Sequence, residues 1–185
     1  MSRTLTLLIT LIFIQTSIIA QVTHSVNIGP SVGLPGKNLK AAKTGWGGEL
    51  DYTAKFALPI GAHIHIGYTH FTNKNFTDEQ LSFMPVRAGL TGFIFQDQIF
   101  VTADAGISFF HEKDHSDYSK SGFSYGFGAG YRVYFDPEKK PYLNVSVNFN
   151  SHNYKKIATS QDYTYRWMNI AIAYGLTWGR KIQAK

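Results

Sequence analysis

The sequence predicts an all-β protein, a single eight-stranded antiparallel up-and-down β-barrel that crosses a membrane. Three observations predict this fold: eight segments with period-two alternation, connections that alternate in length, and an export signal at the N-terminus. Residues 123–135 show the alternation clearly. One set of alternate positions is mostly small, polar or charged: Ser124, Gly126, Gly128, Gly130, Arg132 and Tyr134. The alternating apolar set is Phe123, Tyr125, Phe127, Ala129, Tyr131, Val133 and Phe135. Period two is the periodicity of a β-strand with one apolar and one small or polar face.

Residues 1–20 are predicted to be a cleaved signal peptide, and residues 21–185 are predicted to form the barrel domain. Arg3 supplies a positive start, and an apolar stretch follows at residues 5–14, as in secretory signals. A retained membrane anchor is the alternative. The polar residues at 15–17 interrupt the stretch, which leaves it short of the roughly 20 apolar residues that a spanning helix needs. The chain has no Cys, so neither a lipid-modified cysteine nor a disulfide is expected.

Each strand is placed by its alternation, and most are as long as the ~9 to 11 residues that cross a bilayer at a tilt. In chain order, the strands are expected at residues 25–34, 46–58, 62–71, 81–95, 99–110, 122–135, 142–150 and 163–178.

The connections between these strands alternate in length. Short connections are expected at residues 59–61, 96–98 and 136–141, and longer ones at 35–44, 72–80, 111–121 and 151–162. An outer-membrane barrel has short periplasmic turns and longer external loops. Closure of the sheet would leave no unpaired strand edge in lipid, where each unpaired backbone group costs several kcal/mol.

The orientation of the two faces separates a membrane barrel from a soluble lipocalin-like ligand carrier. A carrier would turn the apolar face inward around an apolar ligand. Gly126, Gly128 and Gly130 favour the opposite orientation, because small residues relieve crowding inside a narrow barrel. Aromatic residues near strand ends are then expected at the water interfaces: Trp46, Tyr68, Phe95, Tyr142, Tyr165 and Trp178.

Charged and histidine side chains on the inward face are the nearest feature to a site. Acids and bases enclosed together should form charge-assisted hydrogen bonds, and a tight turn at 96–98 would bring Arg87 almost opposite Asp104. We expect a structural filling of the lumen, with a gated proton or ion path as the alternative. The predicted interior set is Glu49, Asp51, Lys55, His63, His65, Arg87, Asp104 and Arg132.

Three segments, 84–90, 101–107 and 127–131, resemble strands of the small outer-membrane β-barrel family that includes OmpA and OmpX. The resemblance implies a cell outer membrane location, contact with outer-membrane lipid, and insertion by the barrel-assembly machinery. It also implies a structural or surface-interaction role, in which the external loops could bind an extracellular ligand. In the family the last strand usually ends in an aromatic residue, whereas seven residues follow Trp178 here. A narrow porin-like channel and a lipid A-modifying enzyme are the alternatives.

No catalytic residue, cofactor site or metal site is predicted. Lipid A deacylases and acyltransferases are also eight-stranded barrels with Ser and His near the outer leaflet, and Ser151, His152 and His70 occupy such positions here. An orienting carboxylate at a recognisable spacing is missing, however. One predicted loop also gathers potential metal ligands without completing a set: His111, Asp114, His115 and Asp117.

The chain is basic, with a formal net charge of +6. No nucleic-acid partner is expected, because the chain carries an export signal and no binding motif accompanies the charge. Lysines in external loops would instead contact anionic head groups of the outer leaflet. These lysines are Lys37, Lys40, Lys43, Lys155 and Lys156.

Overall fold

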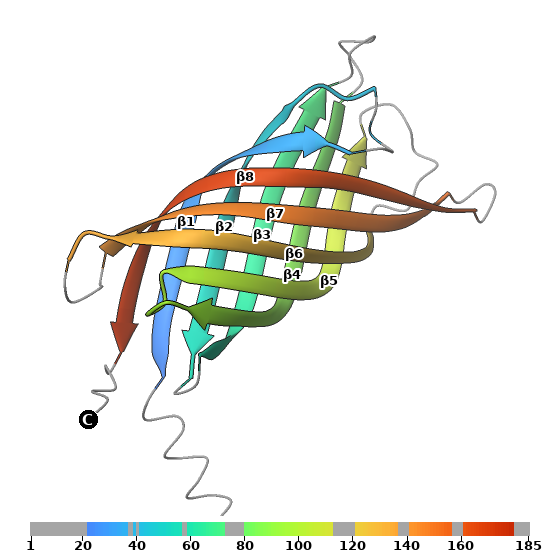
Figure 1. Ribbon diagram of the computed structural model, residues 1–185. Helices are drawn as coiled ribbons and strands as arrows, with labels where there is room; N and C mark the ends of the chain where they lie inside the picture. Colours follow the sequence, from blue (N-terminus) through green and yellow to red (C-terminus); the bar gives the residue numbers. More distant parts are fainter. Residues whose placement is uncertain are drawn as a thin grey trace, which may run out of the picture.

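The computed structural model is a closed antiparallel barrel in which each strand pairs with the next and β8 pairs with β1 (Figure 1). The structure describes residues 22–36, 39, 41–56, 59–72, 80–112, 121–136, 141–156 and 161–179. The strands are β1 Thr23–Pro35, β2 Gly45–Lys55, β3 Ile60–Thr72, β4 Gln80–Ile94, β5 Ile99–Glu112, β6 Ser121–Tyr134, β7 Pro141–Lys156 and β8 Gln161–Gly179. The predicted fold class is confirmed. The predicted signal peptide at residues 1–20 lies outside the described residues. Among the described residues, no helix has the length and apolar character needed to cross a membrane.

The strand bounds agree with the sequence prediction to within three residues, except at one end of β7. The expected loop at 151–162 begins too early, because β7 and β8 stay paired as far as Lys156 opposite Gln161. The connection between these two strands is therefore residues 157–160, so the prediction of a longer connection is wrong here and the alternation of lengths does not extend to the last pair of strands. It follows that Ser151 and His152 lie inside a strand and not in a loop.

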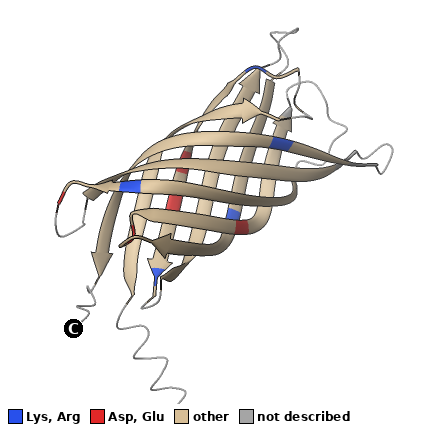
Figure 2. Cartoon of the chain, in the orientation of Figure 1, with Lys and Arg blue, Asp and Glu red and all other residues tan. Residues whose placement is uncertain are grey.

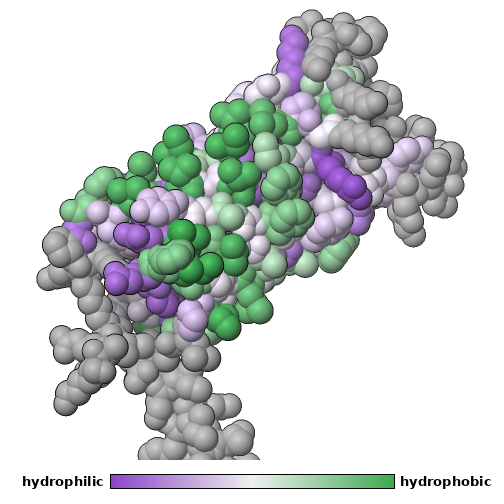
Figure 3. Space-filling model, viewed as in Figure 1, coloured by the Kyte–Doolittle hydropathy of each residue, from purple (hydrophilic) through white to green (hydrophobic). Residues whose placement is uncertain are grey.

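The apolar face points outward, as predicted. Phe123, Phe127 and Val133 of β6 are exposed, whereas Ser124 and Arg132 on the alternate positions are buried. Figure 3 shows apolar side chains spread over the outer wall of the barrel. A soluble carrier would have the reverse arrangement, so the faces fit a barrel embedded in lipid.

Two of the aromatic residues predicted at the water interfaces point inward instead. Tyr142 is fully buried, and Tyr165 packs against the buried aromatic residues of the interior. The error arises because both occupy inward positions of their strands, and an aromatic residue near a strand end does not by itself reveal its face. The other four are exposed as expected: Trp46, Tyr68, Phe95 and Trp178.

Candidate functional site: the barrel interior

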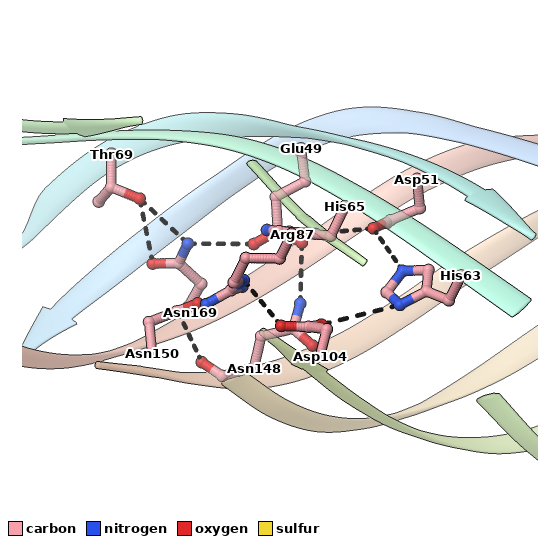
Figure 4. A network of polar contacts seen from close by, with 10 residues as sticks. All are labelled: Glu49, Asp51, His63, His65, Thr69, Arg87, Asp104, Asn148, Asn150 and Asn169. Carbon is pink, nitrogen blue, oxygen red and sulfur yellow. Dashed lines mark hydrogen bonds and ion pairs between the residues drawn. The ribbon is translucent and has the colours of Figure 1, made fainter. Parts of the chain in front are cut away.

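The barrel interior contains three layers of side chains stacked along its axis. An aromatic layer lies toward the barrel end that carries the β3–β4, β5–β6 and β7–β8 connections, a polar network occupies the middle, and an arginine cage lies toward the opposite end. The aromatic layer is Phe71, Phe83, Phe110, His152, Tyr154, Tyr165 and Trp167. The polar network is Glu49, Asp51, His63, His65, Thr69, Arg87, Asp104, Asn148, Asn150 and Asn169 (Figure 4). The arginine cage is Arg132 with Phe93, Phe100 and Tyr142.

Arg87 of β4 is the central cation of the polar network. Its Nε atom lies 2.7 Å from Asp104 Oδ1 on the neighbouring strand β5. Its Nη2 atom donates a hydrogen bond of 2.8 Å to Asn150 Oδ1 on β7. Both Arg87 and Asp104 are almost fully buried, so their ion pair is screened little by solvent.

Glu49 of β2 links the network across the lumen. Its two carboxylate oxygens accept hydrogen bonds from Asn148 Nδ2 at 2.9 Å and from Asn169 Nδ2 at 3.0 Å. Asn169 also donates to Thr69 Oγ1 at 3.1 Å. These contacts join strands β2, β3, β7 and β8 through side chains alone, as Figure 4 shows.

Asp51 of β2 contacts both histidines of β3. Its Oδ1 atom lies 3.1 Å from His63 Nε2 and 2.7 Å from His65 Nδ1. The second ring nitrogen of His63, Nδ1, lies 3.7 Å from Asp104 Oδ2. His63 therefore stands between two carboxylates, one on β2 and one on β5.

Two residues of the predicted interior set lie apart from this network. Lys55 pairs with Asp97 in the short β4–β5 connection, with Nζ to oxygen distances of 2.5 and 2.6 Å, and the pair is partly exposed. Arg132 packs its guanidinium against aromatic rings, at 5.1 Å from the Phe93 centroid and 4.8 Å from the Tyr142 centroid. The other six predicted residues are brought together in the polar network.

The aromatic layer was missed by the sequence reasoning. Phe83 stacks on Trp167 with ring centroids 4.6 Å apart, and Phe71 and Phe110 pack edge-on or tilted around this pair. The signal was present in the alternation. Phe71, Phe83 and Phe110 all occupy the inward parity of their strands, at the ends that adjoin longer connections, so counting parity to the last residue would have found them.

Ser151 and His152 do not form a nucleophile and base. They are adjacent in β7, so their side chains leave opposite faces of the strand. His152 is fully buried against Phe83 and Tyr154, and neither of its ring nitrogens has a hydrogen-bond partner among the described residues. The Ser151 hydroxyl likewise lacks a described partner. Of the loop cluster, His111 is exposed, and residues 114, 115 and 117 lie outside the described residues.

A comparison with known families identifies the chain. The family model of the outer membrane protein β-barrel domain matches residues 5–177. The chain belongs to this family. No curated protein matches it.

This outer-membrane barrel is similar in fold to Ail, the attachment invasion locus protein of Yersinia pestis, at 17% identity over 85% of this chain and 99% of that chain, with a TM-score of 0.56. It is also similar to Neisserial surface protein A, at 11% identity over 84% of this chain and 96% of that chain, with a TM-score of 0.54. A third similar structure is OprG of Pseudomonas aeruginosa, at 11% identity over 87% of this chain and 98% of that chain, with a TM-score of 0.53.

Proposed function

We propose that this outer-membrane barrel is closed to ions and acts in the cell envelope as a structural or surface-interaction protein. The observation that supports the proposal most directly is the contact of Glu49 with Asn148 and Asn169, which spans the lumen at mid-height. A conducting path would have to separate these groups and the Arg87–Asp104 pair. Breaking a buried ion pair of this kind typically costs about 3–5 kcal/mol.

The aromatic layer supports the same proposal independently. Phe71, Phe83 and Trp167 are almost fully buried, and they project from β3, β4 and β8 toward one another. An eight-stranded barrel is just wide enough for side chains to fill its interior. Two layers of different chemistry therefore obstruct the lumen, one by hydrogen bonds and ion pairs and the other by apolar packing.

Single-channel recording in planar lipid bilayers tests the closed barrel. Tag-free protein is purified from membranes, and its folded state is checked by the difference in SDS gel migration between unheated and boiled samples. We expect no conductance steps from the wild type. Regular steps whose frequency scales with the amount of folded barrel would contradict the proposal.

A variant that removes parts of both layers, E49A/F83A/W167A, tests whether these side chains are what closes the lumen. We expect it to conduct if it folds, because the groups that fill the lumen are truncated. The matched control is F127A/F149A, which truncates a stacked aromatic pair on the outward face. This control should show no conductance steps.

Cell assays test the role in the envelope. We expect loss of the protein to raise sensitivity to polymyxin and EDTA, and wild-type protein to restore resistance. A variant tests contact with anionic head groups by replacing five lysines with Gln. These are Lys37, Lys40 and Lys43 of the β1–β2 connection, and Lys155 and Lys156, which lie at the end of β7 and not in a loop as predicted. Full resistance in that variant would show that these lysines do not contribute to the proposed role.

A further inference from the structure

We infer that Asp51, His63 and His65 form a binding site for a divalent transition-metal ion inside the barrel, with Zn²⁺ as the ion to test. Each of the three residues offers one ligand atom, and these three atoms lie within 4.8 Å of one another. Two imidazole nitrogens and a carboxylate oxygen are a donor set that suits zinc and its neighbours. In a tetrahedral zinc site, donor atoms at about 2.0–2.1 Å from the metal lie roughly 3.3 Å apart. The contacts of Asp51 with the two histidines, at 3.1 and 2.7 Å, are shorter than that spacing by about 0.2 and 0.6 Å, and the two histidine nitrogens lie within 4.8 Å of each other, so the side chains would adjust around the ion.

The first argument for a metal is the position of the ring proton on His63. A carboxylate only accepts hydrogen bonds, so the contact with Asp51 requires the His63 proton on Nε2. A neutral imidazole then presents the bare Nδ1 lone pair to Asp104 Oδ2 at 3.7 Å. An ion on Nε2 moves the ring proton to Nδ1, where it faces Asp104. The ion thereby gives a neutral His63 a favourable contact with each of its two carboxylates, which without the ion only the doubly protonated imidazolium would have.

The groups around His63 are arranged like those that surround metal-bound histidines in known metal sites. A metal-bound histidine usually donates its other ring N–H to a carboxylate, which fixes the tautomer and the ring orientation. Asp104 is in position for this contact with His63, and Asp104 itself is held by Arg87 Nε at 2.7 Å. Arg87 is anchored in turn to Asn150. The orienting group is therefore fixed by the scaffold, as Figure 4 shows.

A polar cavity beside the site supplies the open coordination position. Its volume of about 10 Å³ holds about one water molecule, and its wall includes Asp51, His63, Thr91 and Asn144. Thr91 Oγ1 and Asn144 Oδ1 are buried and have no hydrogen-bond partner among the described residues. A metal-bound water in this cavity would donate to such oxygens. These two atoms are the independent sign that a hydrated ligand belongs here.

The charge balance of the interior also favours a cation. Arg87 Nε pairs with Asp104 Oδ1, whereas Asp51 has no Lys or Arg partner among the described residues and is paired with His63 and His65. Figure 2 shows that basic residues are sparse on the strands of the barrel. Buried charge of one sign is costly unless a partner compensates it.

The site is tested by unfolding the tag-free barrel in urea with EDTA, refolding it in the presence of Zn²⁺ and measuring the bound metal after dialysis, because Zn²⁺ need not enter a closed barrel once it has folded. We expect one Zn²⁺ per barrel. H63Q and H65Q should each weaken binding more than tenfold, and D104N should weaken it about 10–100-fold, as for an outer-shell carboxylate. Binding that is absent in the wild type, or unchanged in H63Q and H65Q, overturns the inference.

A matched control separates this site from the histidines of the outer wall and of the predicted loop cluster. The variant H70Q/H111Q/H115Q removes one histidine on the outer wall and two in the predicted loop cluster, and it should bind Zn²⁺ as the wild type does. Loss of binding in this variant would assign the metal to the outer wall or to the predicted loop cluster and overturn the inference. If the lumenal variants fail to fold, X-ray absorption of Zn²⁺ bound to the control variant decides the question. Two imidazole ligands support the site, and fewer than two overturn it.

Discussion

Arg87 and Asp104 form a buried ion pair although neither stands opposite the other in the strand register. Arg87 pairs with Gly106, and Asp104 pairs with Gly89, so the two side chains meet diagonally across β4 and β5 with Nε and Oδ1 2.7 Å apart. Both register partners are glycines, which leave the interior volume between the strands open for the two charged groups. The pair then becomes the centre of the network that connects β2, β3 and β7.

Replacing Arg87 should destabilise the barrel strongly. R87M leaves Asp104 buried without its cation, and we expect a loss of about 3–5 kcal/mol in the free energy of unfolding. Urea titration of the refolded barrel, followed by tryptophan fluorescence, measures this loss. The control is K55M, because the Lys55–Asp97 pair is partly exposed and should contribute no more than about 1 kcal/mol.

The double variant R87M/D104N should be less destabilised than the sum of the two single variants. Removing both charges leaves no unpaired carboxylate, whereas each single change does leave an uncompensated group. Additive losses would show that the two residues act independently and would contradict the coupling seen in the structure.

Gly126 should not tolerate a side chain. A β-carbon at position 126 would lie 2.7 Å from Arg87 Nη1 and 2.8 Å from Arg87 Cζ, so G126A forces the guanidinium out of its network. We expect a loss of about 1–3 kcal/mol, typical of overpacking. G92A is the matched control, because a β-carbon there meets only Val101 Cγ2 at 3.4 Å on the outer wall. Equal stability of the two variants would contradict the packing argument.

The three tryptophans should report the two faces of the barrel. Trp46 and Trp178 are exposed on the outer wall, whereas Trp167 is 2% exposed and packs inside the aromatic layer. In bilayers that contain brominated lipid, we expect fluorescence quenching of the wild type and little quenching of W46F/W178F. Strong quenching of the remaining Trp167 would place it in contact with lipid and would refute the assignment of faces.

Lipid A should be unchanged by this protein. Ser151 and His152 leave opposite faces of β7, so a hydroxyl nucleophile and its base are not assembled there. Mass spectrometry of lipid A from cells with and without the protein should show the same species. A mass shift that S151A or H152Q abolishes would establish the enzyme instead.

The sequence by itself determined the class of the fold, the number of strands and the face that each strand turns to lipid. These properties depend on period-two alternation, which is local and which a strand preserves whatever its neighbours are. The six charged and histidine residues that meet in the polar network could be named for the same reason, since parity places them in the lumen. The end of β7 was misplaced, because its last residues are held by pairing with β8 and not by an apolar pattern of their own.

Only the tertiary structure decided which interior side chains meet. Shear and closure bring Glu49 to Asn148 and Asn169, which are 99 and 120 residues away in the chain, and no local pattern encodes these contacts. The same closure separates Lys55 and Arg132 from the acids with which the sequence had grouped them. It also places His63 between two carboxylates from different strands, a relationship that arises only when β2, β3 and β5 are wrapped around one lumen.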